Sequence, residues 1–297
     1  MTSITTLKPA TKAYSDFANA YLESSWPKRL NLNIDLLTPV NCQLRLPYSE
    51  EINNGTSAIH GGIIASAMHD AGLLLATHAF SDKQQLTVRT IDFKVSFLRA
   101  AKETDLTIDA TILRQSKRMA FINVVATDKS GQPVASVNCS FGTWEEEAST
   151  PISPDLYVPL LNKQVADHSL KHMMKSVVES RVEGMAVEEM GEGFCRMRLD
   201  NIACYQDQHG YISSGAQLTL VDNVGAFGAL AGINAMGMGS TVDISLTSCE
   251  AVKDENLIGV AEAMARRGSQ ISSRVSVISE KSQRLIAFGT VSLWVKF

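Results

Sequence analysis

Two long stretches of the chain are apolar on every side, at residues 63–80 and 216–232. A helix without a polar face must be covered all round, so each stretch predicts a buried central helix. After the first stretch, residues 90–97 alternate strictly between apolar and polar side chains, and residues 106–112 do the same. This period of two predicts strands that bury one face.

The two halves of the chain show the same order of elements. Short amphipathic helices are expected at 13–23 and 169–179, followed by strand-like segments at 42–48 and 194–200. A glycine-bearing turn, the apolar helix and three or four strands complete each half. An antiparallel sheet curling around its helix would cover that helix, which predicts an α+β unit.

An internal repeat underlies this order. The segment "TIDFKVSFLRAAKETDL" (90–106) aligns without a gap with "TVDISLTSCEAVKDENL" (241–257), and upstream Gly62 aligns with Gly215. The offset stays between 151 and 153 residues, so two domains of about 150 residues repeat one design. We predict an N-terminal domain at 1–148, a linker at 149–165 and a C-terminal domain at 166–297, since residues 145–157 are acidic and then proline-containing.

Composition narrows the class of protein. The 297 residues are 45% hydrophobic and 20% charged, with a formal net charge of −4, which gives no electrostatic case for nucleic acid or an anionic membrane as partner. Residues 1–20 lack the apolar core of a signal peptide. The longest apolar run contains His69, Asp70 and His78, so we expect a buried helix there rather than a membrane span. A soluble, cytoplasmic protein is expected.

The cysteines carry no metal or disulfide pattern. They are odd in number and form no CxxC pair, so neither a disulfide framework nor a zinc site is predicted; they are Cys42, Cys139, Cys195, Cys204 and Cys249. His60, His69 and His78 invite a metal interpretation, but nine-residue steps place successive side chains on opposite faces of a helix. We therefore expect no metal.

Candidate chemistry lies where the first apolar helix begins. His60, Gly61 and Gly62 open it, and Asn54 lies six residues upstream. A helix N-terminus with bare glycine amides favours an electron-rich oxygen.

Together with the 90–99 strand and the basic "LRQSKR" segment (113–118), this arrangement resembles the hotdog-fold thioesterases of the PaaI-like acyl-CoA thioesterase type. The family pattern is an asparagine, His-Gly-Gly six residues on, an acid nine residues after that histidine, and a Thr/Ser-x-Asp strand. The resemblance implies two tandem hotdog domains paired as a pseudo-dimer, each with an antiparallel sheet wrapped around a central apolar helix. Active sites then lie between the two units.

The two halves depart from this pattern in complementary ways. In the first half His69 takes the place of the acid, and Asp70 follows one residue later, about 100° around the helix. In the second half Ser213, Ser214 and Gly215 replace His-Gly-Gly and Asp207 replaces the asparagine, whereas Asp222 is in register and Ser240 and Thr241 follow. We predict that Asn54, His60 and Gly61 face Asp222 and Thr241 across the domain interface.

The resemblance also implies roles. The Gly61 amide, with Gly62 beside it, would stabilise the oxyanion, and Asn54 would position the reacting groups. Asp222 would be general base or nucleophile, held by Thr241 or Ser240. Coenzyme A enters only as part of the substrate, and no cofactor is needed. Its phosphates would meet cations on two equivalent hairpins, Arg114, Lys117 and Arg118 on one and Arg266 and Arg267 on the other.

Simpler interpretations stay open for each residue. Asp222 can make a structural hydrogen bond, His60 can hold the helix start, and Gly61 and Gly62 can form a tight turn. His69, Asp70, Ser213 and Gly215 are read as the remnant of a second site. The basic hairpins can be solvated turns.

Three functions compete at this point. The first is hydrolysis of acyl-CoA at one interdomain site. The second is a non-catalytic acyl-CoA-binding or assembly protein with degenerate hotdog sites. The third is a hydratase or dehydratase, whose Asp/His pattern is not found here. A homodimer of the tandem unit is also expected, because a hotdog sheet pair leaves a second face.

Overall fold

The computed structural model describes residues 12–81, 87–144, 157–207, 209–233 and 238–296. The N-terminal half contains helices α1 (Lys12–Leu22), α2 (Ser25–Arg29) and α3 (Gly61–Ala79), the 3-10 turn η1 (Glu50–Ile52), and strands β1 (Asn33–Leu37), β2 (Asn41–Leu46), β3 (Thr87–Phe97), β4 (Leu106–Gln115), β5 (Met119–Asp128) and β6 (Pro133–Trp144). The C-terminal half contains α4 (Val158–Leu161), α5 (Lys171–Arg181) and α6 (Ser214–Ala231), the 3-10 turn η3 (Ala203–Tyr205), and strands β7 (Met185–Gly191), β8 (Phe194–Leu199), β9 (Met238–Ser248), β10 (Leu257–Arg267), β11 (Gln270–Ser279) and β12 (Leu285–Lys296).

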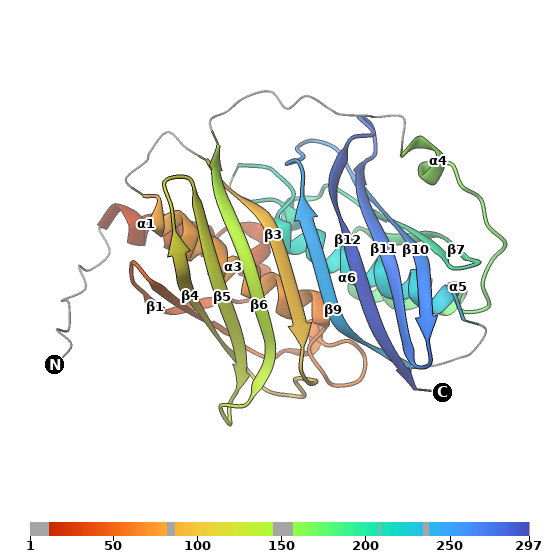
Figure 1. The fold of residues 1–297 in the computed structure, drawn as a ribbon, viewed down its shortest axis with the longest axis horizontal. Helices are drawn as coiled ribbons and strands as arrows, with labels where there is room; N and C mark the ends of the chain where they lie inside the picture. Colours follow the sequence, from red (N-terminus) through yellow and green to blue (C-terminus); the bar gives the residue numbers. More distant parts are fainter. Residues whose placement is uncertain (1–11, 82–86, 145–156, 208, 234–237, 297) are drawn as a thin grey trace.

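These strands form one antiparallel sheet in the order β1-β2-β4-β5-β6-β3-β9-β12-β11-β10-β8-β7. The order of the last six strands mirrors that of the first six, and the long apolar helices α3 and α6 lie behind the sheet, one behind each half (Figure 1). The α+β hotdog architecture expected from the sequence is therefore confirmed. Residues 149–156 of the predicted linker at 149–165 lie outside the described part of the chain, and the remainder contains α4; the limits of the linker stay a prediction.

The two halves join where β3 pairs with β9. Lys94 pairs with Ser245, which is its own counterpart in the repeat at an offset of 151 residues. A residue that pairs with its own repeat partner marks the pseudo-two-fold axis. Alternate β3 residues Phe93 and Val95 are fully buried against the helices, as the period of two predicts.

The central helices touch near their N-termini, at positions occupied by glycine. A Cβ on Gly62 would lie 2.8 Å from the Cα of Thr219 in α6. The pseudo-symmetric contact places Gly215 of α6 against the side chain of Ser66 in α3, 2.1 Å from where a Cβ would be. Glycine is required by the approach of the α6 backbone at Gly62 and of the Ser66 and Trp26 side chains at Gly215, and not by a left-handed backbone angle.

The buried residues lie along both central helices and on the strands that cover them. Three of the cysteines, all on strands, are among them. Cys42, Cys139 and Cys195 are buried, Cys204 is half-buried and Cys249 is exposed, and all five are free thiols. Burial raises the pKa of the Cys42 thiol to about 12 and also raises that of Cys139 and Cys195. Within the described residues no helix is long and apolar enough to cross a membrane, and no group of three or more His, Cys, Asp or Glu side chains could hold a metal ion.

The first prediction concerns thiol reactivity. At pH 8 in native protein, a thiol-disulfide reagent should modify Cys249 rapidly and Cys204 slowly, because attack requires an accessible thiolate. Cys42, Cys139 and Cys195 should react only after a denaturant is added. Cys249→Ser should remove the fast phase. Rapid modification of all five thiols in native protein would contradict this packing.

The second prediction concerns the helix crossing. Gly62→Ala should lower the free energy of unfolding by about 1–3 kcal/mol, because the new methyl group meets backbone that has no room to yield. Gly72→Ala in the same helix is the matched control, since its Cβ would meet the side chains of Phe141 and Cys139 at 3.1 and 3.2 Å. Urea denaturation of both variants measures their free energies of unfolding. Equal values for Gly62→Ala and Gly72→Ala would contradict the close crossing of α3 and α6.

Candidate active site

The N-terminus of α3 is capped from both halves of the chain. His60 is the N-cap residue, and its Nδ1 accepts a hydrogen bond from the Gly62 N–H at 3.0 Å. The Oδ2 atom of Asp222 in α6 accepts from the same N–H at 2.7 Å. The carboxylate is the closer acceptor, and a negative charge at this end of a helix is stabilised by the helix dipole.

The other oxygen of Asp222 is held from its own half. Thr241, near the start of β9, donates its hydroxyl hydrogen to Oδ1 of Asp222 at 2.8 Å. Asp222 is only 4% exposed, and burial of a carboxylate is costly unless it is hydrogen-bonded. The two bonds therefore fix the carboxylate and join the halves at the same point.

Two further groups complete the immediate surroundings. The imidazole Nδ1 of His60 lies 3.3 Å from Oδ2 of Asp222, so both acceptors converge on the Gly62 N–H. The first helical amide, at Gly61, has no hydrogen-bond partner among the described residues, and a Cβ on Gly61 would lie 3.0 Å from Asp222 Oδ2. An open amide beside a carboxylate is an arrangement that can bind an oxyanion while a base acts next to it.

These groups face one cavity of about 720 Å³. His60, Gly61, Asp222 and Thr241 line it, so the structure brings together the residues that the sequence distributed over two halves. Ser240 lines the cavity too. Gly62 is not part of the lining, and its amide donates to Asp222.

Asn54 lines the cavity but directs its side chain to its own loop. Its Oδ1 accepts from the Thr56 N–H at 2.9 Å and from the Thr56 hydroxyl at 2.6 Å. These contacts of Asn54 thus shape the loop before α3.

The cations that line the cavity differ from those proposed from the hairpins. Arg29, Arg99 and Arg181 line it. The hairpin with Arg266 and Arg267 lies at the same end of the sheet as Ser240, to which it is connected by strand pairing through β11 and β12.

The other hairpin lies at the opposite end. Arg114 of β4 pairs with Phe121 of β5. Two residues before Phe121, Met119 pairs with Gly142 of β6, and Gly142 pairs with Arg89 at the start of β3. Arg114, Lys117 and Arg118 are therefore remote from Asp222, and neither hairpin contributes a residue to the cavity wall.

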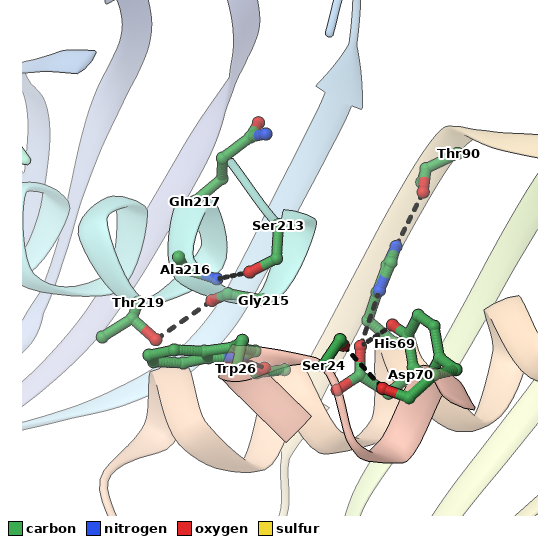
Figure 2. Close-up of polar contacts among 12 residues, drawn as sticks. Ser24, Trp26, His69, Asp70, Thr90, Ser213, Gly215, Ala216, Gln217 and Thr219 are labelled. Carbon is green, nitrogen blue, oxygen red and sulfur yellow. Dashed lines mark hydrogen bonds and ion pairs between the residues drawn. The ribbon is translucent and has the colours of Figure 1, made fainter. Parts of the chain in front are cut away.

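The pseudo-symmetric position at the N-terminus of α6 is filled by a side chain. Ser213 caps this helix by accepting from the Ala216 N–H at 3.2 Å. Figure 2 shows the indole of Trp26 lying against the first turn of α6, where Nε1 donates to the Ser66 hydroxyl at 2.6 Å. A Cβ on Gly215 would lie 2.2 Å from that nitrogen. The indole therefore packs against Gly215, which is the counterpart of Gly62 in the repeat.

Trp26 belongs to an insertion in the first half. Ten residues separate α1 from β1, and they carry α2, whereas three residues separate α5 from β7. This helix was not predicted from the sequence, although a serine at the N-cap (Ser24) and a proline in the first turn (Pro27) are helix-start signals. Phe97 and Asn223, which also line the cavity, were missed as well, because both look like ordinary strand and helix positions.

His69 and Asp70 form a closed polar cluster. His69 Nε2 lies 2.7 Å from the Thr90 hydroxyl and Nδ1 lies 3.5 Å from Asp70 Oδ1 (Figure 2). The Tyr21 hydroxyl donates to the same carboxylate oxygen at 2.8 Å; burial, and then the charge of Asp70, raise the pKa of Tyr21. His69 and Asp70 are each 1% exposed, so this remnant has no access to substrate.

Comparison of the sequence with known proteins shows which family the chain belongs to. The family model described as "Thioesterase superfamily" matches residues 57–135. A "Putative esterase" of Halobacterium salinarum is 35% identical over 88 residues, which span 29% of this chain and 58% of that protein. A "Putative esterase" of Sulfurisphaera tokodaii is 30% identical over 102 residues, 34% of this chain and 71% of that protein.

Solved structures match over almost the whole length. A tesB protein of Mycobacterium avium has a TM-score of 0.64 at 13% identity and covers 95% of this chain and 99% of its own. A protein of unknown function with a hot dog fold from Alicyclobacillus acidocaldarius has a TM-score of 0.60 at 18% identity, with coverages of 94% and 98%. These identities show a shared fold, whereas the family-model match covers the segment that carries His60 and Gly61. The chain belongs to the thioesterase superfamily and has the hotdog fold in tandem.

Proposed function

We propose that this protein hydrolyses an acyl thioester, with coenzyme A as the thiol, at the single site between its halves. The observation that carries the proposal is the meeting of the Asp222 carboxylate and the N-terminus of α3 in one cavity. Family membership supports the reaction type. It is also the reaction that an oxyanion-binding amide and a fixed carboxylate serve without a metal or cofactor.

In this mechanism the thioester carbonyl oxygen binds at the Gly61 amide. As a general base, Asp222, held by Thr241 and Gly62, takes a proton from water as the water oxygen attacks the carbonyl carbon; the tetrahedral intermediate then collapses, the carbon–sulfur bond breaks, and the thiolate takes up the proton from Asp222. As a nucleophile, Asp222 attacks the carbonyl carbon itself and the thiolate leaves as the anhydride forms. Water then attacks the aspartyl carbonyl of the anhydride, which releases the acid and restores the carboxylate, and the thiolate takes up a proton from that water. Single turnover in ¹⁸O-water separates the routes, because only nucleophilic attack leaves ¹⁸O in the protein carboxylate.

Cations at the cavity suit the phosphates of coenzyme A. Arg181 is held by its contacts to Asn53, at 3.1 Å to Oδ1 and 3.3 Å to the carbonyl oxygen. Arg29 lies 3.7 Å from Glu183, a separation that leaves room to exchange partners. Guanidinium groups bind phosphate in a two-point geometry. We propose Arg29 and Arg181 for this role, and the roles of the hairpin residues stay predictions.

A second candidate function is binding of acyl-CoA without turnover. It is favoured by one observation, namely that both oxygens of Asp222 already accept hydrogen bonds, as those of a structural carboxylate do. Binding of acyl-CoA with no thiol release in wild type would select this candidate.

The third prediction tests the site. Asp222→Asn should lower kcat/KM for acyl-CoA hydrolysis by a hundredfold or more, because the amide keeps the hydrogen-bond acceptor at Oδ1 yet neither accepts a proton nor attacks. Thiol release measured across short-chain, long-chain and aryl acyl-CoAs provides the readout.

Asp70→Asn is the matched control, since Asp70 is a buried acid of the other central helix and does not line the cavity. Its activity should stay within about threefold of wild type once the folded fraction is verified by thermal denaturation. Activity that survives Asp222→Asn and disappears in Asp70→Asn would overturn the assignment.

A further inference from the structure

The cavity continues beyond the catalytic carboxylate as an apolar arm. Along α6 its lining residues follow Asp222 at helical spacing on one face, as Asn223, Ala226, Phe227 and Leu230. Eight residues at 1.5 Å each carry this stripe about 12 Å from Asp222 to Leu230. Beyond Asn223 the stripe has no polar side chain.

Helix α5 forms the opposite wall of the arm. The residues of this segment that line the arm are Leu170, Met173, Met174, Val177, Val178 and Arg181. The three aliphatic residues, two methionines and one arginine follow the three- and four-residue spacing of one helix face; Leu170 and Val178 are buried, and Met173 and Val177 are exposed at the rim. Methionine adapts to chains of varied shape, so this wall suits flexible aliphatic groups.

Contacts at both ends of α5 set its direction. Just before its start, His168 Nε2 lies 3.2 Å from the carbonyl oxygen of Ile233, which follows the C-terminal end of α6. At its end, Arg181 donates to Asn53 in the loop before α3. α5 and α6 are therefore antiparallel, and the arm runs from a polar mouth at Arg181 to an apolar end at Leu170 and Leu230.

Strand residues close the remaining side. Leu293 and Gly239 line the arm, and a Cβ on Gly239 would lie 3.8 Å from the Leu230 side chain and 3.0 Å from that of Leu293. The charged residues of the described lining are Arg29, Glu51, Arg99, Arg181 and Asp222, with His60 titratable. None of them lies on α6 beyond Asp222.

We propose that this arm binds the acyl group, and that the preferred substrate is an unbranched aliphatic thioester whose chain of about eight to ten carbons spans the 12 Å between Asp222 and Leu230. This inference rests on the proposed function for the position of the thioester carbonyl. A single aromatic ring would fill only the first part of the arm. The far end of the arm, at Leu170 and Leu230, limits the length of the acyl chain that fits.

The fourth prediction follows from this limit on acyl-chain length. In a series of straight-chain acyl-CoAs from two to sixteen carbons, wild-type kcat/KM should peak at about eight to ten carbons. Leu230→Trp should shift the peak to shorter chains, Ala226→Phe should shift it further because it blocks the arm about 6 Å from Asp222, and Leu230→Ala should shift it to longer chains.

Ser176→Trp is the matched control, because Ser176 is on the exposed face of α5 and does not line the cavity. Its profile should equal that of wild type. A peak at two carbons or at a benzoyl group, or a profile that Ala226→Phe and both Leu230 variants leave unmoved, would overturn the arm while leaving thioesterase activity intact.

Direct binding separates this inference from the reaction. If no acyl-CoA is hydrolysed, calorimetric titration with decanoate reads the arm alone. Binding to wild type that Ala226→Phe weakens at least tenfold, and that Ser176→Trp leaves unchanged, would support the arm even though the proposed reaction had failed. No binding of decanoate to wild type would overturn it.

Discussion

The structure depends on the hydrogen bond between the Gly62 amide and the Asp222 carboxylate, which joins residues 160 positions apart. A buried carboxylate tolerates few environments, and a helix N-terminus supplies two of its needs, a donor and a favourable dipole. That contact requires α3 and α6 to approach closely, and glycine at position 62 permits it because a Cβ would lie 2.8 Å from the Thr219 backbone. Fold and site therefore share one constraint.

The repeat has become asymmetric around this contact. The first half keeps the helix N-terminus and the second half keeps the acid, so each half supplies what the other lost. At the start of α6 the insertion that carries α2 packs Trp26 against Gly215, and it also contributes Trp26 and Arg29 to the wall of the open cavity. At the lost site, His69 and Asp70 are buried and have no access to substrate.

Repetition made much of this readable from the sequence. Period-two strands, two all-round apolar helices and the registers of Asp222 and Thr241 predicted the sheet, the central helices and the meeting of the halves. The cavity itself was not predictable, because its walls come from Leu170, Phe227 and Leu293, whose apolar side chains look like core in any window. Trp26 illustrates the same limit: a tryptophan predicts burial, and only the tertiary structure shows that it packs against the start of α6 and lines the cavity. The basic hairpins were placed by analogy between halves, and strand register puts one of them at the far end of the sheet.

The central claim is that one chain holds one competent site, built from both halves. Calorimetric titration of wild-type protein with a non-hydrolysable thioether analogue of decanoyl-CoA tests it most directly. The account predicts one molecule bound per chain, because His69 and Asp70, at the acid positions of the second site, are each 1% exposed. Two molecules per chain would contradict it, since both helix N-termini would then be accessible.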